Sequence, residues 1–195
     1  PRSTPKPSSA ASDVYKRQVP EVAAKWHCDK HVVKMILESA QMLSTAHRIL
    51  DGVESRRPSV SGKTMSRYWE LSDERESKLY KAVHMKHPST LWTMESHLNY
   101  KWHYELFKCL CKEYTYRYGK VHVSESKLLD VLKDTPKNIK KSYMTPFALA
   151  MGSNPECIDY DDRVGSYQNF YQTKQKRFSM TWKGREIPHW FKIHK

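Results

Sequence analysis

Apolar residues recur at three- and four-residue steps over two long stretches of this chain, and this spacing is its strongest constraint on fold. The period matches the 3.6 residues of an α-helical turn. It predicts one helix over residues 20–50 and a second over residues 87–119, where Gly119 supplies a stop signal. Alternating strand patterns are nearly absent. We therefore expect a single compact domain that is mainly α-helical, with long irregular loops.

Shorter segments complete this expectation. Residues 51–63 are polar and contain Pro and Gly, which predicts a loop. Residues 64–84 are rich in charge with a weak helical period, and we interpret them as a solvated helix. The rest of the chain predicts a short helix over 124–132 with Ser124 as its cap, irregular structure over 134–160, a last helix over 161–174, and a basic, aromatic tail from Gln175.

The first 18 residues are set aside. Residues 8–18 read SSAASDVYKRQ, which is the in-frame translation of a common transposase sequencing adaptor. We expect such a segment to take no part in the native fold. We expect it to replace the native N-terminus, so the domain is expected to span residues 19–195.

The charge balance favours a polyanionic partner. The whole chain carries a net charge of +13; residues 1–18 hold four cations and one acid, a net +3, which leaves +10 for the rest. DNA is the expected partner, and a merely soluble basic protein is the alternative. The four cysteines form no CxxC pair, which favours a reducing cytoplasm. No apolar run reaches transmembrane length, so no membrane partner is expected.

The segment HCDKHVVKMILE, residues 27–38, is the strongest candidate for a site. On a helix, a polar stripe is expected to face away from an apolar sector. The stripe comprises His27, His31, Lys34, Glu38, Gln41 and Thr45, and the apolar sector comprises Val33, Ile36, Leu37, Ala40, Leu43 and Leu50.

Three interpretations of the stripe stay open. His27 and His31, one turn apart, can share a metal ion, with a third ligand from His87, His122 or Glu38. The stripe can instead be a polar face that hydrogen-bonds to neighbouring loops. It can also perform acid–base chemistry without a metal. We expect no cofactor and no metal.

Two further segments mix cations with aromatic side chains. Residues 113–120 read EYTYRYGK, where Arg117 and Lys120 either complement a helix C-terminus or bind phosphates. The tail offers the same choice, because its aromatics can pin it to the core or stack on bases. Its candidate residues are Lys174, Lys176, Arg177, Trp182, Lys183, Arg185, Trp190 and Phe191. The motifs GxxxxGK[ST], GxGxxG and GxSxG are missing.

Residues 23–46, residues 87–120 and, more weakly, the C-terminal stretch resemble the pyrimidine-dimer DNA glycosylase family of the endonuclease V type. The resemblance covers about two fifths of the chain. It implies a compact helical enzyme that flips a base at a damaged site. It also implies attack on the sugar C1′ by an N-terminal α-amine, with a glutamate that assists glycosidic cleavage and β-elimination through a Schiff base.

Carried onto this chain, the resemblance implies roles for individual residues. Glu38, nine residues after Asp29, is implied as the catalytic carboxylate, with His31 and Lys34 beside it. The DNA-binding side chains are expected to be His27, His87, Arg117, Lys120, Lys183 and Arg185. The long loops around 51–63 and 134–160 depart from the compact family members, so a modified base is as possible a substrate as a dimer.

We therefore expect a monomeric glycosylase and abasic-site lyase that acts on damaged or modified DNA bases. A non-catalytic nucleic-acid-binding protein and a metal-dependent hydrolase using His27 and His31 are the alternatives.

Overall fold

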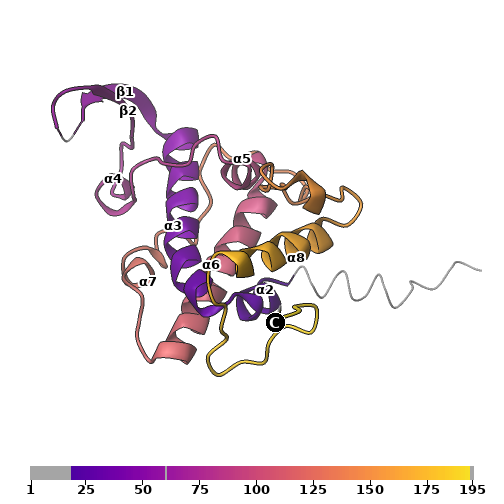
Figure 1. The fold of residues 1–195 in the computed structure, drawn as a ribbon. Coiled ribbons are helices and arrows are strands. Elements are labelled where there is room, and N and C mark those ends of the chain that lie inside the picture. The colour runs from indigo at the N-terminus through magenta and orange to yellow at the C-terminus, as the bar shows by residue number, and fades with distance from the viewer. Residues whose placement is uncertain (1–18, 60, 194–195) are drawn as a thin grey trace, which may run out of the picture.

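Two long helices, α3 (Asp29–Asp51) and α6 (His97–Tyr118), pack against each other at the centre of the molecule (Figure 1). The computed structural model describes residues 19–59 and 61–193. The expected mainly α-helical fold is confirmed. The predicted adaptor segment, residues 1–18, lies outside the described residues. Buried side chains join the two helices, and these are Val32, Ile36, Ala40 and Leu43 of α3 with Tyr100, Phe107, Leu110 and Cys111 of α6.

Shorter elements surround this pair. They are α2 (Pro20–Trp26), β1 (Val53–Pro58), β2 (Met65–Glu70), α4 (Arg75–Lys78), α5 (Pro88–Glu95), α7 (Val123–Leu128), the 3₁₀ turns η1 (Pro155–Cys157) and η2 (Lys174–Lys176), and α8 (Arg163–Thr173). The irregular segment over 134–160 is confirmed apart from η1, and α8 matches the predicted last helix. α7 begins one residue before Ser124 because His122 caps it, accepting from the Ser124 N–H at 3.1 Å. None of the helices in residues 19–59 and 61–193 has the length and apolarity needed to cross a bilayer.

The predicted helix over residues 20–50 is in fact two helices. His27 and Cys28 are both extended, with ψ angles of 133° and 164°, and they separate α2 from α3. The interruption lets distant segments bind its backbone: the Tyr171 hydroxyl accepts from Cys28 N–H at 2.9 Å, and the Thr181 carbonyl accepts from Asp29 N–H at 2.8 Å. The hydrophobic period continues across the break, so it gives no local warning of it.

The predicted helix over residues 87–119 is also divided. Ser96 is extended, with φ −153° and ψ 157°, and its side chain caps α6 by accepting from Asn99 N–H at 3.1 Å. A serine cap satisfies an amide that has no partner within the helix. Gly119 ends α6 in the left-handed conformation, with φ 65°, as expected of a C-terminal glycine.

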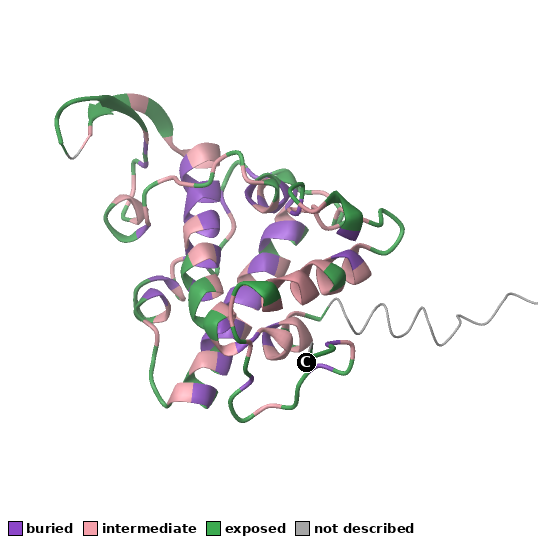
Figure 2. Cartoon of the chain, in the orientation of Figure 1, coloured by how far each residue is buried: buried purple, intermediate pink, exposed green. Residues whose placement is uncertain are grey.

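The loop expected over 51–63 and the solvated helix expected over 64–84 were wrong for β1 and β2, and within 64–84 only α4 is helical. The antiparallel strands β1 and β2 form a hairpin there, which projects from the end of α3 and is exposed over most of its surface (Figure 2). Pairing of the strands brings charged and aromatic side chains into contact, whereas a helix would place them on different faces. Arg67 pairs with Glu54 at 2.6 Å, and Arg57 pairs with Glu70 at 2.7 Å and covers the Tyr68 ring. Such cross-strand pairs stabilise a hairpin.

Arg48, near the C-terminus of α3, anchors the hairpin to the helical body. Its side chain is almost fully buried and pairs with Glu76 at 2.8 Å. It also donates to the backbone carbonyls of Trp69, Glu76, Leu79 and Tyr80. Every side of the guanidinium therefore has an acceptor, which is the condition for burying a charge.

The apolar sector predicted on α3 was partly wrong. Ile36, Ala40 and Leu43 are buried, but Val33 and Leu37 are 39% and 41% exposed. The neighbouring Val32 is buried instead, so the core face is rotated by about one residue position. Thr45 leaves the polar stripe as well, because it is buried and donates to the Val83 carbonyl at 2.8 Å.

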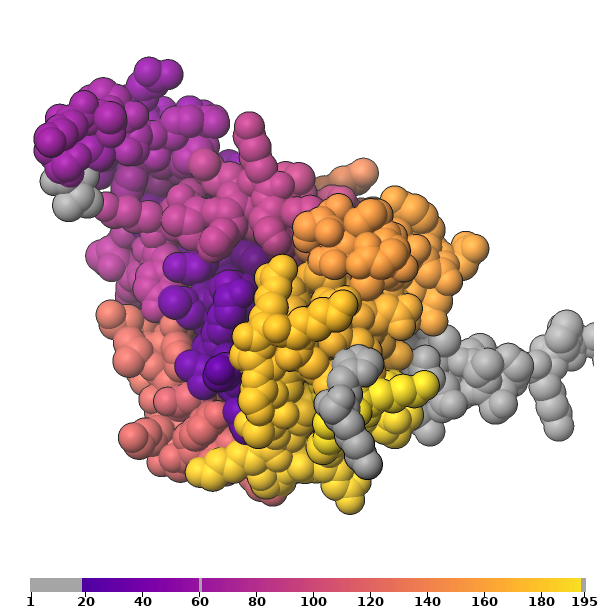
Figure 3. Space-filling view, viewed as in Figure 1, coloured from indigo at the N-terminus to yellow at the C-terminus, as the bar shows by residue number. Residues whose placement is uncertain are grey.

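The C-terminal segment folds back over the start of α3 and buries Cys28, Trp182 and Phe191 in a second small core (Figure 3). Asp29 fixes it by accepting from Thr181 Oγ1 at 2.7 Å and from Lys183 N–H at 2.9 Å. The tail is therefore pinned to the helical body by Asp29 and the aromatics, which was one of its two predicted roles.

Candidate functional site

A cavity of about 640 Å³ lies between the start of α3, the start of α5 and the end of α8. The volume falls within the usual range for small-molecule sites. His27, His31, Lys34 and Glu38 all line it, so the structure brings together the first four residues of the predicted stripe. His87 lines it too.

The interior of the cavity is aromatic. Trp92, Trp102 and Phe147 are in mutual contact, with ring centroids 4.6–5.8 Å apart. The tail side contributes Tyr171, Phe178 and Trp190. Flat, apolar walls of this kind bind a planar ring.

Glu38 is the one carboxylate among the described residues that line this cavity, and it forms an ion pair with Lys34. The two side chains are one helical turn apart, with 3.0 Å between Lys34 Nζ and Glu38 Oε1. Glu38 is 26% exposed and Lys34 is 62% exposed. The carboxylate is thus partly shielded but still reachable from the cavity, as a general base must be.

His31 is held by a tyrosine from the far end of the chain. The Tyr171 hydroxyl lies 2.7 Å from His31 Nδ1 and also accepts from Cys28 N–H. This hydrogen bond fixes the orientation of the His31 ring against α8. Burial lowers the pKa of His31 to about 4, and the positive charges of His27, Lys34 and Lys174 act in the same direction. His31 is therefore neutral at physiological pH.

His27 and His87 are also kept neutral. His27 sits at the end of α2 with Nδ1 2.6 Å from the Ala23 carbonyl, and burial lowers its pKa. His87 caps α5 by accepting from Ser89 N–H at 3.2 Å. Burial lowers its pKa too, and the Glu38 carboxylate opposes that shift. Both imidazoles have a local hydrogen-bonding role, and both still line the cavity.

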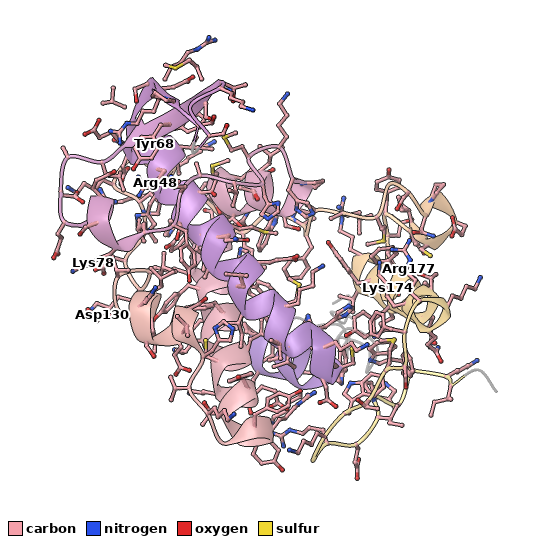
Figure 4. All side chains as sticks on the ribbon, turned by 60° about the vertical axis from the view of Figure 1, so that its left-hand side comes forward. Arg48, Tyr68, Lys78, Asp130, Lys174 and Arg177 are labelled. Atoms are coloured by element: carbon pink, nitrogen blue, oxygen red, sulfur yellow. The ribbon has the colours of Figure 1, made fainter. Side chains whose placement is uncertain are left out.

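Cations outnumber carboxylates at this site. Besides Lys34, the lining includes Lys30, Lys174 and Arg177, against Glu38 alone. Lys174 and Arg177 lie together on the side of α3 away from the hairpin (Figure 4). The Lys30 ammonium lies 4.9 Å from the centroid of the Phe178 ring, and Lys174 lies 3.8 Å from that of Phe170. An anion is therefore the electrostatically favoured ligand.

Arg117 does not lie on this surface, which corrects the prediction that it binds phosphates. Its side chain is fully buried and pairs with Glu113 at 2.7 Å and with Asp29 at 2.9 Å. Arg185 pairs with the same Glu113 at 2.9 Å and covers the Tyr116 ring. These arginines fix the tail and α6 to the start of α3, and their charges are already compensated.

Lys120 and Lys183 do lie together. They line a shallow groove with Lys30, Tyr114, Tyr118 and Asp29, whose carboxylate is already paired with Arg117. The Lys183 ammonium is 5.5 Å from the Tyr118 ring centroid. Lys30 lines both this groove and the cavity. The predicted cations Lys120 and Lys183 therefore extend the positive surface of the cavity along the start of α3.

Within the described residues, no group of three or more His, Cys, Asp and Glu side chains is arranged to hold a metal ion. The pair His27 and His31 therefore has no third protein ligand in residues 19–59 and 61–193. His122, one of the candidates, instead caps α7.

Several lining residues were not assigned to the stripe's site from the sequence. Tyr171, Lys174 and Arg177 lie about 140 residues from His31 and meet it only because the tail folds back. In the sequence, only the mixture of cations and aromatics from Lys174 onward indicated that this segment binds a ligand. It predicted a nucleic-acid contact but could not place it beside the stripe. Trp102 and Phe147 carried no signal beyond their hydrophobicity.

Comparisons with protein-family models, with curated proteins and with solved structures find no match to this chain.

Proposed function

We propose that this protein binds DNA and acts as a glycosylase and abasic-site lyase on a base drawn out of the double helix into the cavity. The observation that carries the proposal is the combination in one cavity of aromatic walls, a single accessible carboxylate and an excess of cations. An extruded nucleotide presents a planar base, a sugar and phosphates. Each of these has a matching surface here.

The Glu38 carboxylate is suited to the chemistry at the sugar. In this reaction class an amine of the protein loses a proton and displaces the nucleobase at C1′. A general base then removes a proton from C2′, and the strand breaks. Glu38 can accept both the proton that the amine loses and the proton removed from C2′. The resemblance to the pyrimidine-dimer glycosylases implies an N-terminal α-amine, and a lysine that lines the cavity is the other possible source of the amine.

The groove that holds Lys120 and Lys183 supports the DNA-binding part of the proposal. It continues from the cavity through Lys30, so one strand can follow the positive surface while its nucleotide enters the cavity. Lysines of this kind contact phosphates and position the duplex without reading its sequence.

A duplex with one abasic site, incubated with borohydride, tests the proposal. The protein is expected to form a covalent adduct and, without borohydride, to cut the strand. Glu38→Gln is expected to slow cleavage by about 10²–10⁴-fold, because it removes the general base. Its melting temperature should stay close to that of the parent.

Glu21→Gln is the matched control. Glu21 also pairs with a lysine one turn away on an exposed helix face, at 2.7 Å from Lys25, but it does not line the cavity. It should leave cleavage unchanged. DNA binding without any adduct would support a non-catalytic binding protein instead. Cleavage that a chelator abolishes would support the metal-dependent hydrolase.

A further inference from the structure

We infer that Lys174 is the amine nucleophile of this site. The inference rests on the proposed function and names an internal residue in place of an N-terminal amine. It assigns Lys174 a covalent role that neither its position in the sequence nor its tail context predicts.

The position of Lys174 is the first reason. Lys174 follows α8 directly and lines the cavity together with Glu38 and His31. Tyr171, one turn earlier, is hydrogen-bonded to His31 and so fixes this end of α8 against α3. The Lys174 ammonium lies over the Phe170 ring, and no carboxylate of the described residues forms an ion pair with it.

Lys30 and Lys34 also line the cavity and are less suited. Both are exposed to water, whereas Lys174 is partly buried. Lys34 has a further disadvantage. Its Nζ lies 3.0 Å from the Glu38 carboxylate, which favours the protonated form. An amine must lose its proton to attack, so a partly buried lysine without a carboxylate partner is the better nucleophile.

The local field supports this choice. Burial lowers the pKa of Lys174, and the positive charges of Arg177 and Lys34 lower it further. The face of Phe170 attracts the ammonium and acts against this shift. The geometry therefore provides a lysine whose neutral form is more accessible than that of an ordinary surface lysine.

The step balances in protons and electrons. Lys174 Nζ forms a bond to C1′ while the glycosidic bond breaks. The departing base keeps the bonding pair and takes a proton from water, and the hydroxide that remains is neutralised by the proton that Glu38 later removes from C2′. Glu38 accepts the proton that the amine loses and passes it to O4′ as the sugar ring opens, which leaves a protonated imine. The regenerated carboxylate then removes a C2′ proton, the C3′–O bond breaks, and the phosphate leaves. Water hydrolyses the imine to free the lysine.

Borohydride trapping of the full chain on abasic-site DNA, followed by proteolysis and mass spectrometry, identifies the attacking amine. The adduct is expected on Lys174. Lys174→Arg keeps a cation over Phe170 but cannot be deprotonated, so trapping should fall on the order of 100-fold. Lys176→Arg is the control: Lys176 is two residues away and does not line the cavity, and its trapping should equal that of the parent. Equal melting temperatures would show that each variant is folded.

A second measurement separates chemistry from structure. The trapping rate of the parent should reach its plateau below the ordinary lysine pKa of about 10.4. Arg177→Gln removes one of the charges that disfavour the ammonium, and should move the plateau to higher pH.

The outcomes distinguish the two proposals. An adduct on Lys30, on Lys34 or on an N-terminal residue, still formed in Lys174→Arg, would overturn this inference and leave the proposed function standing. DNA binding with no adduct on any residue would overturn both.

Discussion

Two charge clusters lie towards opposite ends of α3, and they are balanced in different ways (Figure 4). At the C-terminal end, Arg48 pairs with Glu76, and Arg75 pairs with Asp51 and Asp73. At the N-terminal end, the cavity is lined by Lys30, Lys34, Lys174 and Arg177, and of these Lys34 alone forms an ion pair with Glu38.

The difference distinguishes cations whose ion pairs stabilise the fold from cations that can bind a ligand. A buried cation is tolerated only with partners on every side, and the cluster around Arg48 meets that condition. The cavity cluster does not, so its charge remains available to a ligand. Ion pairing also distinguishes two arginines that both lie in basic segments of the sequence. Arg117 is paired with carboxylates, whereas Arg177 lines the cavity.

The largest expected effect tests the compensated cluster. Arg48→Ala should lower the free energy of unfolding by about 3–5 kcal/mol, because it removes the cation that pairs with Glu76 and leaves several buried carbonyls without a donor. Urea denaturation measures this loss. Arg57→Ala, which breaks an exposed hairpin pair, should cost at most about 1 kcal/mol. Equal losses in the two variants would show that the Arg48 cluster does not anchor the hairpin.

The second prediction compares Arg117 with Arg177. Arg117→Ala should destabilise the fold by about 3 kcal/mol, because Glu113 and Asp29 lose a buried partner. Arg177→Ala should stay within about 0.5 kcal/mol of the parent, as for other surface changes. Arg177→Ala should nevertheless weaken the binding of duplex DNA, which fluorescence anisotropy measures. Strong destabilisation by Arg177→Ala would remove the distinction between the clusters.

Acid should destabilise the protein through both regions. The pKa values of His31 and of the buried His47 are each lowered to about 4, mainly by burial. The unfolded chain therefore binds more protons than the native one between about pH 6.5 and pH 4, and stability falls as the pH falls through that window. His31→Gln and His47→Gln should each make the decline shallower. Urea midpoints measured at pH 7, 5.5 and 4.5 test this, and an unchanged slope in His31→Gln would show that the pKa of His31 is not lowered in the native state.

The smallest expected effect concerns the groove. DNA affinity should fall steeply between roughly 50 and 200 mM salt, because phosphate contacts release counterions. Lys183→Ala should reduce the slope of log affinity against log salt by about 1, and Lys120→Ala should do the same. Lys176→Ala, outside both the groove and the cavity, should leave the slope unchanged. A flat salt response in the parent would contradict phosphate-based binding altogether.

Periodicity predicted the helical class and most of the central pair α3 and α6. A helix buries one face, so its apolar residues recur every three or four positions in the sequence. The same spacing placed His31, Lys34 and Glu38 on one face. It missed the breaks at His27–Cys28 and at Ser96, since the hydrophobic period continues across both. It also missed the hairpin, whose stabilising pairs join residues 13 positions apart.

The sequence by itself determined that the chain is helical and basic, and that a stripe of imidazole, ammonium and carboxylate lies on its first long helix. Only the tertiary structure decided which cations are free. Arg117 and Lys174 look alike in a list of basic residues, but Arg117 meets Asp29 from 88 residues away and Lys174 meets no carboxylate of the described chain. Ion pairing depends on distances of a few ångströms between segments far apart in sequence, and such distances are set by how the helices and the tail pack.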